Sequence, residues 1–319
     1  MNEESFLTEK DLVKNKDGEY ETEMGEKVKE IEEQNYVYRF EREVLEEIRE
    51  WTNSHVSPKS IQNKMLDEVS QPRPHLSISR PKSRISWGID VPSDPSQTVY
   101  VWLDALTNYL TVVNFNIDLV PNFIHFVGKD IAKFHCIYWP SFLISAFGVK
   151  PGKVVNHGHW LKDGRKMSKS LGNVVEPNEL IGKYGIDSIR LYFLGYGPLT
   201  KDMDFDEDFL QKIHNNLLID SYMNMLFRMT GKKILKKFGG SINKPDLCFQ
   251  DQITKINILA LESLSLMSSY DFPEALKRIE TIIHLGNHCL SINEFWSLED
   301  PEPILYLTLE TMKVVSILL

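Results

Sequence analysis

This chain of 319 residues has little cysteine, no long apolar run and no surplus of positive charge. Its three cysteines, Cys136, Cys248 and Cys289, are widely spaced and include no CxxC pair. The sequence therefore offers neither a disulfide framework nor a cysteine zinc site, and it fits a reducing compartment. No apolar run reaches the length of about eighteen residues that a transmembrane helix needs, so no membrane span is expected.

Net charge and the first residues argue against further classes of protein. The formal net charge of −9 argues against a generally basic coat for nucleic acid. Residues 1–5 (MNEES) are acidic, and the start shows neither the apolar stretch of a secretory signal nor the Arg-rich pattern of an organellar presequence. With 42% hydrophobic and 25% charged residues the composition is that of an ordinary globular protein, and the length predicts about two domains.

Positive charge is nevertheless concentrated in one short run. Four lysines lie within residues 231–237 (GKKILKK). Such a run is either a local contact for RNA or the solvated face of a helix, and the sequence leaves both interpretations open.

The most informative run is Lys166 to Ser170, KMSKS, with LGNVVEP directly after it. By composition alone, two lysines three apart are more often part of a solvated turn. The whole string, however, places two ammonium groups, two hydroxyls and a glycine in one short segment. Such a segment can close over phosphate, and Lys166 and Lys169 can neutralise the charge that grows as a phosphoryl bond breaks. The run therefore predicts nucleotide chemistry.

Up to about residue 205 the pattern alternates between strands and helices. A short strand at 36–40 leads into an acidic amphipathic helix. The further strands expected are 76–80, 85–87, 98–103, 123–127 and 153–156, and the further helices begin at Asp104, at Asp130 (to Phe147) and at Asp187 (to Leu194). This alternation is typical of a parallel sheet covered by helices, the α/β class.

After about Phe205 no strand-like run appears. The stretches 206–237, 250–269, 273–291 and 303–319 carry the helical spacing of apolar residues. The sequence therefore predicts a second, all-helical domain. Because its last stretch is very apolar, we expect this domain to be incomplete at its C-terminal end.

Residues 99–110 (VYVWLDALTNYL) and 127–140 (VGKDIAKFHCIYWP) resemble two segments of the methionyl-tRNA synthetases, which are class I aminoacyl-tRNA synthetases. The resemblance is closest to their mitochondrial and bacterial-like forms. The KMSKS run alone does not separate this family from the isoleucyl, valyl and leucyl enzymes of the same class. The two segments favour methionine, and a branched amino acid stays the alternative.

The resemblance implies a fold and a division of the chain. We expect the C-terminal half of a class I Rossmann-like catalytic domain, followed by a helical-bundle anticodon-binding domain. Residues 1–52 would be a remnant of the connective insertion, 53–205 the half-domain with the KMSKS loop, and 206–319 the anticodon-binding domain. The first half of the nucleotide-binding fold, with its HIGH segment, has no counterpart in the sequence, so we expect a fragment, splice product or incomplete gene model with impaired catalysis.

The resemblance also implies a methionine pocket. Methionine is unbranched, apolar and polarizable, so a pocket for it should offer aromatic faces and a hydrogen-bonding group that suits sulfur. On the pattern alone, an aromatic stripe at helical spacing is more often core than pocket. The residues implied are Val101, Trp102, Ala105, Leu106, Tyr109, Ile131, Phe134 and His135.

For ATP, the resemblance implies contacts from two strand ends and from the KMSKS run. A glycine at 128 permits close approach of the backbone, and a carboxylate at 130 can accept from ribose hydroxyls, although Asp130 could equally be a helix N-cap. The full implied set is Gly128, Asp130, His157, Gly158, Trp160, Lys166, Ser168 and Lys169, with Lys166 and Lys169 catalytic. The HxH spacing at 157–159 lacks a third ligand nearby and is weak evidence for zinc, so no metal site is expected in the chain.

In the helical domain the resemblance implies three readers of the methionine anticodon: Asn224, Arg228 and Trp296. Loop bases of RNA are recognised by stacking on aromatic rings and by hydrogen bonds to their edges. Asp220 stands where the family often has a second asparagine, and it lacks the amide donor. The alternative is that these residues only pack helices together.

The implied reaction is a methionine–tRNA ligase reaction in mitochondrial translation. Methionine attacks the α-phosphate of Mg²⁺-bound ATP, and the terminal ribose of tRNA(Met) then takes the activated methionine. The implied location is the mitochondrial matrix, with the cytoplasm as alternative, and the implied state is a monomer. A second hypothesis is a tRNA-binding form that does not catalyse.

Overall fold

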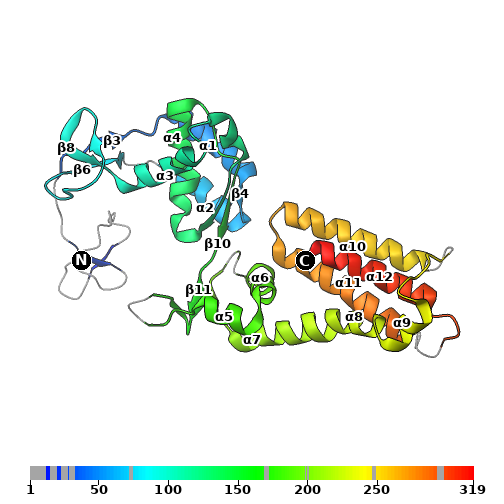
Figure 1. The fold of residues 1–319 in the computed structure, drawn as a ribbon. Coiled ribbons are helices and arrows are strands. Elements are labelled where there is room, and N and C mark those ends of the chain that lie inside the picture. The colour runs from blue at the N-terminus through cyan, green and yellow to red at the C-terminus, as the bar shows by residue number, and fades with distance from the viewer. Residues whose placement is uncertain are drawn as a thin grey trace.

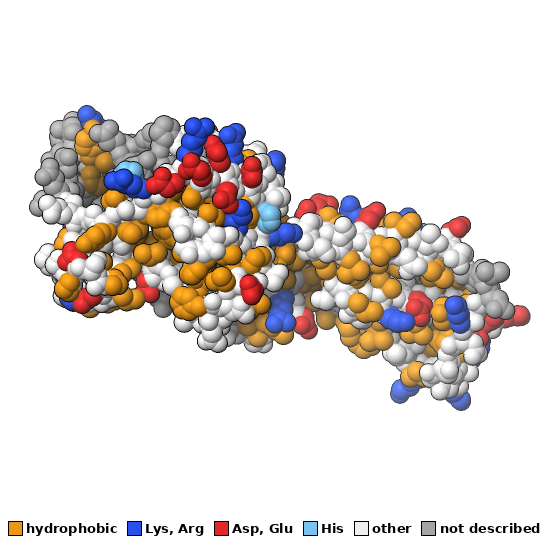
Figure 2. Space-filling view, turned by 90° about the horizontal axis from the view of Figure 1, so that it is seen from above, with side chains coloured by type: hydrophobic (Ala, Val, Ile, Leu, Met, Phe, Trp, Pro, Cys, Tyr) orange, Lys and Arg blue, Asp and Glu red, His pale blue; other side chains and the backbone are white. Residues whose placement is uncertain are grey.

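The computed structural model describes residues 12–14, 20–22, 28, 33–71, 75–168, 172–197, 199, 201–245, 249–292 and 298–319. These residues form an elongated molecule with two bodies joined by a narrow waist (Figures 1 and 2). The first body holds strands β1 to β10 and helices α1 to α4, and the second is helical. The segment with β11 and α5 to α7 lies between them in Figure 1.

The first body is built on a three-stranded parallel sheet. Its strands are β4 (Val56–Ser57), β9 (Ile124–Gly128) and β10 (Lys153–His157), in the order β4-β10-β9. Helices α1 (Arg42–His55), α2 (Lys59–Ser70) and α4 (Trp139–Phe147) accompany it. A parallel sheet with helices against it is the predicted α/β class, which is confirmed.

Buried and exposed side chains alternate along β9, which shows which face of the sheet the helices cover. His125 and Val127 are buried, whereas Ile124 and Phe126 are exposed. On the covered face, Val127 joins a core that includes Ile48 of α1 and Val154 of β10. The strand therefore turns one set of side chains toward the helices, as the period of two in a strand requires.

Before helix α3 (Val101–Val112), the chain forms a set of short strands that pair in antiparallel fashion. They are β1 (Leu12–Lys14), β2 (Tyr20–Thr22), β3 (Val37–Tyr38), β5 (Leu76–Ser77), β6 (Ser79–Pro81), β7 (Asp90–Val91) and β8 (Asp94–Val99). The predicted strand at 98–103 is wrong in its second half, because helix α3 (Val101–Val112) begins at Val101. The apolar run at 99–103 fits a buried strand and an apolar helix start equally, so the pattern does not mark the boundary.

The predicted helix from Asp130 to Phe147 is also different in detail. A 3-10 turn, η3 (Lys129–Ile131), comes first, a π-helical turn, η4 (Phe134–Tyr138), follows, and only then does α4 begin. A π turn inserts an extra residue into the helix and is frequent at functional sites. Here it falls within the predicted methionine-binding residues.

The middle segment comprises β11 (Trp160–Lys162), β12 (Arg165–Lys166), α5 (Pro177–Tyr184), α6 (Ile186–Gly195), β13 (Met203–Asp204) and α7 (Glu207–Lys212). β11 pairs antiparallel with β12 and parallel with β13. Asp163 and Gly164 form the tight turn between β11 and β12, both with positive φ (55° and 72°). This hairpin carries the start of the KMSKS run.

The second body contains only helices among its described residues. They are the π-helix η6 (Ile213–Met223), α8 (Asn224–Met229), α9 (Lys232–Phe238), α10 (Gln250–Ser268), α11 (Phe272–Ile292) and α12 (Glu302–Leu318). The stretch predicted as one helix from 206 to 237 is divided into four elements, α7, η6, α8 and α9. Gly231 separates α8 from α9, where a helix would be weakest.

Several contacts join the helical body to the middle segment and to the first body. Gly195 at the end of α6 lies so close to α11 that a Cβ atom there would come within 2.1 Å of Leu276 Cδ2. At the turn between α10 and α11, the ring of Tyr270 meets the ring of Phe126 on β9 edge to face, 5.5 Å between centroids. Tyr270 has φ of 65°, a strained value for a residue with a side chain.

In the described part of the chain, no helix combines the length and the apolar character that crossing a bilayer requires.

Candidate active site

The carboxyl ends of β9 and β10 meet at one edge of the parallel sheet, where Gly128 is paired with His157. Residues 129–130 follow β9 and residues 158–159 follow β10. In open α/β sheets, ligands bind in the crevice beyond this edge. The fold therefore brings the predicted ATP-binding residues of the two strand ends together.

Asp130 lies at this edge and contacts two basic side chains. Its Oδ2 accepts a hydrogen bond from Lys166 Nζ at 3.2 Å, and its Oδ1 lies 3.6 Å from His159 Nε2. Partial burial raises the pKa of the Asp130 carboxyl, but the Lys166 hydrogen bond and the charges of His159 and Lys166 outweigh burial and lower it. Asp130 thus stays ionised and keeps its acceptor oxygens at neutral pH. Since η3 begins with Lys129, Asp130 is not its N-cap.

A second carboxylate, Asp202, fixes the loops on both sides. It accepts a hydrogen bond from the backbone N–H of His159 at 2.8 Å and pairs with Lys129 Nζ at 2.7 Å. The His159 hydrogen bond and Lys129 lower the pKa of Asp202. Asp202 was not among the predicted residues, because nothing near it in the sequence marks its partner His159, 43 residues upstream.

Close approach requires a glycine at 158, and one at 128 leaves room for the Asp130 carboxylate. A Cβ on Gly158 would lie 2.3 Å from the backbone carbonyl oxygen of Lys201, so it would displace the chain there. A Cβ on Gly128 would lie 2.7 Å from Asp130 Oδ1, so it would push that side chain away from its position. Gly158 therefore maintains the spacing of the edge, and Gly128 the position of Asp130.

The described part of the KMSKS run is held by Asn173. Its Oδ1 accepts from the backbone N–H of Ser168 at 2.9 Å, and its Nδ2 donates to the carbonyl of Lys166 at 3.3 Å. Met167 packs against the core around Leu180. Lys166 therefore projects from an anchored hairpin toward Asp130. Lys169, the other predicted catalytic lysine, lies outside the described residues.

His157 and Trp160, also predicted for ATP, lie on either side of Gly158. His157 is exposed, and its Nδ1 lies 2.8 Å from the carbonyl of Gly158. Trp160 is half-buried and stacks on Tyr192, with 5.2 Å between ring centroids. Most of its contacts are thus with the aromatic core of α6.

Four of the predicted methionine-binding residues form one aromatic cluster. Trp102 stacks on Phe134 with 3.8 Å between centroids, and its edge approaches His135. Tyr109 Oη lies 2.9 Å from His135 Nε2. The π turn η4 places Phe134 and His135 against α3, which supplies Trp102 and Tyr109.

The other four predicted residues differ in position. Leu106 is fully buried in the core with Leu110 and Leu143, so it supports the cluster from behind. Ile131 is half-buried and packs against the core formed by the sheet and helices α1 and α2. Val101 and Ala105 are exposed on α3.

The direction of the hydrogen bonds in the cluster follows from a backbone carbonyl. His135 Nδ1 lies 3.0 Å from the carbonyl oxygen of Ile131, which can only accept. The proton of the neutral ring is therefore on Nδ1, and Nε2 must accept from the hydroxyl of Tyr109. Burial lowers the pKa of His135, which keeps the ring neutral.

His125 and Trp139 complete the cluster and were not predicted. Trp139 Nε1 donates to His125 Nε2 over 3.2 Å, and the His125 ring lies 4.5 Å from that of Tyr109. Burial, with the nearby His135, lowers the pKa of His125 to about 4. No signal in the sequence marks His125, because alternation along this strand would place the apolar pair Ile124 and Phe126, not His125, on the covered face.

The predicted anticodon readers lie on α8. Asn224 is its first residue and is exposed, and Arg228 is one turn further and half-buried. Asp220 precedes them in the wider π-helix η6, so it is not one regular α-turn before Asn224. Trp296 lies outside the described residues.

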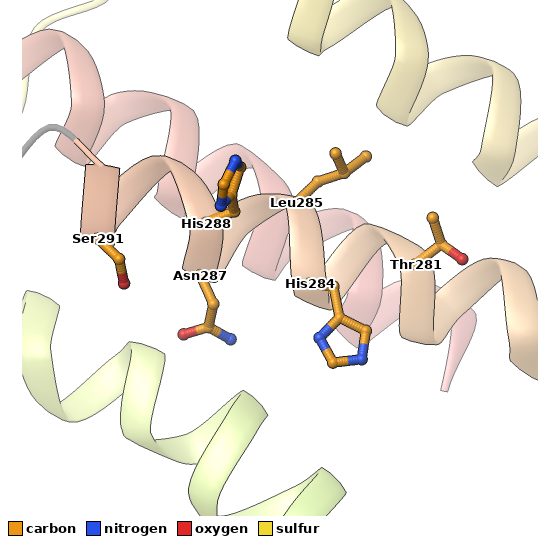
Figure 3. Close-up of a pocket in the computed structure, with 6 residues that line it drawn as sticks. All are labelled: Thr281, His284, Leu285, Asn287, His288 and Ser291. Atoms are coloured by element: carbon orange, nitrogen blue, oxygen red, sulfur yellow. The ribbon is translucent and has the colours of Figure 1, made fainter.

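Helix α11 supports this region. Asn287 Nδ2 donates to the carbonyl of Ser221 in η6 over 3.0 Å, which fixes the helix directly before α8. Asn287 and His284 point toward the neighbouring green helix, and His288 points away from it (Figure 3). They line a shallow cavity of about 460 Å³ together with Thr281, Leu285 and Ser291.

A larger cavity, of about 800 Å³, lies between α6, η6 and the ends of α10 to α12, and none of the sequence-predicted site residues lines it. Among the described residues, no group of three or more His, Cys, Asp and Glu side chains is arranged to hold a metal ion.

An α/β sheet with a lysine hairpin over its carboxyl edge, joined to a helical body, is the architecture expected of a class I synthetase. The family model described as tRNA synthetases class I (M) matches residues 19–230. The chain therefore belongs to the methionine family of class I tRNA synthetases.

Individual relatives agree with this. The mitochondrial methionine–tRNA ligase of Saccharomyces cerevisiae is 33% identical over 377 residues, covering 100% of this chain and 65% of the relative. A probable mitochondrial methionine–tRNA ligase of Dictyostelium discoideum is 37% identical, covering 93% of this chain and 56% of the relative. The crystal structure of Mycobacterium tuberculosis methionyl-tRNA synthetase bound by methionyl-adenylate superimposes with a TM-score of 0.85 at 28% identity, covering 98% of this chain and 65% of that one. The chain thus spans 56% to 65% of the length of these proteins.

Proposed function

We propose that this chain serves the ATP-dependent activation of methionine and its transfer to tRNA(Met). The observation that carries the proposal is the ionised Asp130 between Lys166 and His159, at the sheet edge where nucleotides bind in such folds. The turn η4, which supplies Phe134 and His135 to the aromatic cluster, follows the end of β9 in the chain. The methionyl-adenylate bound in the related structure combines the two groups that these sites would take.

In the first step the methionine carboxylate attacks the α-phosphate of ATP, and pyrophosphate leaves. Asp130 would accept hydrogen bonds from the ribose hydroxyls, with Gly128 and Gly158 allowing the nucleoside to approach the backbone. Lys166, and Lys169 by resemblance, would stabilise the charge on the transferring phosphates. Mg²⁺ would enter with ATP, its usual partner, rather than on a protein cage.

The methionine side chain would lie against the stacked rings of Trp102 and Phe134. Apolar faces and polarizable rings favour a thioether, whereas the Tyr109 hydroxyl gives its proton to His135 and not to the weakly accepting sulfur. This pocket would therefore select an unbranched side chain. Val101, Ala105, Leu106 and Ile131 would complete or support it.

In the second step the terminal ribose of tRNA(Met) attacks the activated carbonyl. The exposed amide of Asn224 and the guanidinium of Arg228 would read anticodon bases, with Trp296 as the stacking partner by resemblance. The mitochondrial names of relatives support action in the mitochondrial matrix. A monomeric state is part of the same proposal.

Methionine-dependent exchange of pyrophosphate into ATP tests the proposal. We expect Lys166→Ala to reduce exchange on the order of a hundredfold, since it removes a charge partner of the transition state. Lys313→Ala on α12 is the matched control and should leave the rate unchanged. Exchange driven by isoleucine or valine in preference to methionine would instead assign the chain to the branched-amino-acid enzymes.

A tRNA-binding role without catalysis is the second candidate, supported by the exposed Asn224 and the neighbouring Arg228 on α8. For this candidate we expect the chain to bind tRNA(Met), and Asn224→Ala to weaken that binding. Pyrophosphate should not exchange into ATP at any methionine concentration.

A further inference from the structure

Helix α9 (Lys232–Phe238) is strongly basic in an otherwise acidic protein. From Asn224 to Phe238, across α8 and α9, the sequence has one arginine and four lysines and no acidic residue. The whole chain has a formal net charge of −9. A cationic segment in an acidic chain marks a local contact for polyanions rather than a general charge property.

The packing of α9 turns its lysines outward. Ile234 and Phe238 pack against the core that contains Met225 and Leu290. All four lysines are exposed. Their spacing, two adjacent pairs four residues apart, forms one outer face about one helical turn long.

Helix stability does not account for this arrangement. Lys232 and Lys233 lie in the first turn, where the helix dipole is unfavourable to cations, and no acidic residue shares that turn. Only Lys236 and Lys237 lie in the last turn, where the dipole favours them. The first pair therefore raises the energy of the isolated helix.

Lys237 differs from the other three. Its Nζ donates to the carbonyl oxygen of Glu299 over 2.8 Å and lies 5.5 Å from the centre of the Phe238 ring. Among the described residues, no hydrogen bond or ion pair engages Lys232, Lys233 or Lys236. Lys237 thus holds the loop before α12, and three ammonium groups are left for a ligand.

Helix α8, with Asn224 and Arg228, leads into α9 through Thr230 and Gly231. We propose that Lys232, Lys233 and Lys236 bind the RNA backbone beside the loop that α8 would read. The inference rests on the proposed function and extends it: α8 distinguishes bases, whereas α9 supplies sequence-independent affinity by neutralising phosphates.

Fluorescence anisotropy with the full chain tests this, using short RNA hairpins with the loop anticodon CAU or GAU. We expect Lys232→Gln/Lys233→Gln/Lys236→Gln to weaken both hairpins by the same factor, roughly tenfold or more near 0.1 M salt. The slope of log K against log salt concentration should fall by about 2 to 3, close to one per lysine. Lys237→Gln should change the slope least.

The matched control removes three exposed lysines of α7, α11 and α12: Lys212→Gln/Lys277→Gln/Lys313→Gln. An equal loss of affinity in this control would overturn the proposal, because net charge alone would then explain the effect. So would an unchanged salt slope in the α9 variant, or binding of poly-glutamate as tight as that of the hairpins, which would indicate an acidic protein partner.

The same data separate this proposal from the proposed function. Equal affinity of the unaltered chain for CAU and GAU hairpins would contradict anticodon reading, while dependence on the α9 lysines would still establish the phosphate contact. Preference for the CAU hairpin, with no dependence on the α9 lysines, would support anticodon reading and contradict the phosphate contact.

Discussion

The hydroxyl of Tyr109 donates its proton to Nε2 of His135, 2.9 Å away, because Nδ1 of the same ring donates to the carbonyl of Ile131. The orientation of a side chain in the proposed pocket is thus set by a backbone oxygen on a neighbouring turn. The pocket faces its ligand with an oxygen acceptor and two stacked rings.

Removal of that hydroxyl should weaken methionine binding. In Tyr109→Phe, Nε2 of His135 loses its donor, and we expect a loss of about 1–2 kcal/mol in methionine affinity. Affinity for norleucine, which has a methylene in place of sulfur, should fall by a similar factor, because the hydroxyl proton goes to His135 and not to the sulfur. Calorimetric titration of both amino acids measures this, with Tyr306→Phe on α12 as control. A larger loss for methionine than for norleucine would show that the hydroxyl donates to the sulfur instead.

The Asp130–Lys166 pair predicts a pH dependence of nucleoside binding. The pKa of Asp130 is lowered, so its carboxylate is lost only as pH falls through a value below the ordinary 3.8. Adenosine, which has no phosphate for Lys166 to bind, should therefore bind with constant affinity from about pH 5 to 8. In Lys166→Met the pKa of Asp130 rises, and the fall in adenosine affinity should begin at a higher pH.

Asp130→Asn is the companion variant. A neutral amide oxygen is a weaker acceptor than a carboxylate, so adenosine affinity should fall by roughly tenfold at pH 7. If Asp130→Asn bound adenosine as well as the unaltered chain does, Asp130 would have no part in ribose binding.

Histidine burial predicts that stability depends on pH. The pKa of His125 is about 4 in the fold and near 6.5 when unfolded, so the unfolded chain binds the extra proton first. Its contribution is complete above pH 6.5 and is lost as pH falls toward 4, and the linked change in the free energy of unfolding across that window is about 3 kcal/mol. Urea unfolding at several pH values should show a smaller slope for His125→Phe. The exposed His288→Gln serves as control and should keep the original slope.

The contact between α6 and α11 predicts an overpacking effect. In Gly195→Ala the new methyl group would meet Leu276 Cδ2 at 2.1 Å, so we expect a loss of about 1–3 kcal/mol in the free energy of unfolding. Gly182→Ala, within α5 and with nothing within 4 Å, should instead stabilise by about 0.5–1 kcal/mol. Thermal unfolding compares the two. The combination Gly195→Ala/Leu276→Ala should cost less than the sum of the two changes, and additivity would contradict the contact.

The sequence predicted the class of fold because periodicity survives in long elements. Strands 123–127 and 153–156 and the helices at 250–269 and 273–291 fall within a few residues of β9, β10, α10 and α11. The errors lie where periodicity is ambiguous. The apolar residues 99–103 fit either a strand or a helix, and neither the π turn η4 nor η6 leaves a mark in composition.

For the site, the sequence supplied residues that share a local motif and missed those that act across distance. Lys166, Asp130, Tyr109 and His135 were predicted, and the structure brings them into two pairs. Asp202 and Trp139 were missed as site residues because no motif assigns them a ligand, and their roles come only from contacts with His159 and His125. Only the folded chain shows such contacts.

Tyr270, at the turn between α10 and α11, is held by two strands of the sheet: its ring meets Phe126 of β9 edge to face, and Lys153 Nζ of β10 lies 5.1 Å from the centre of the ring. The hydroxyl of Tyr196 donates to Glu280 of α11, and Gly195 approaches Leu276 of the same helix. The helical body is therefore attached both to the sheet and to the segment that follows the lysine hairpin. Because Phe126 lies two residues before Gly128 on the same strand, a displacement of the α10–α11 turn would act directly on the carboxyl end of β9.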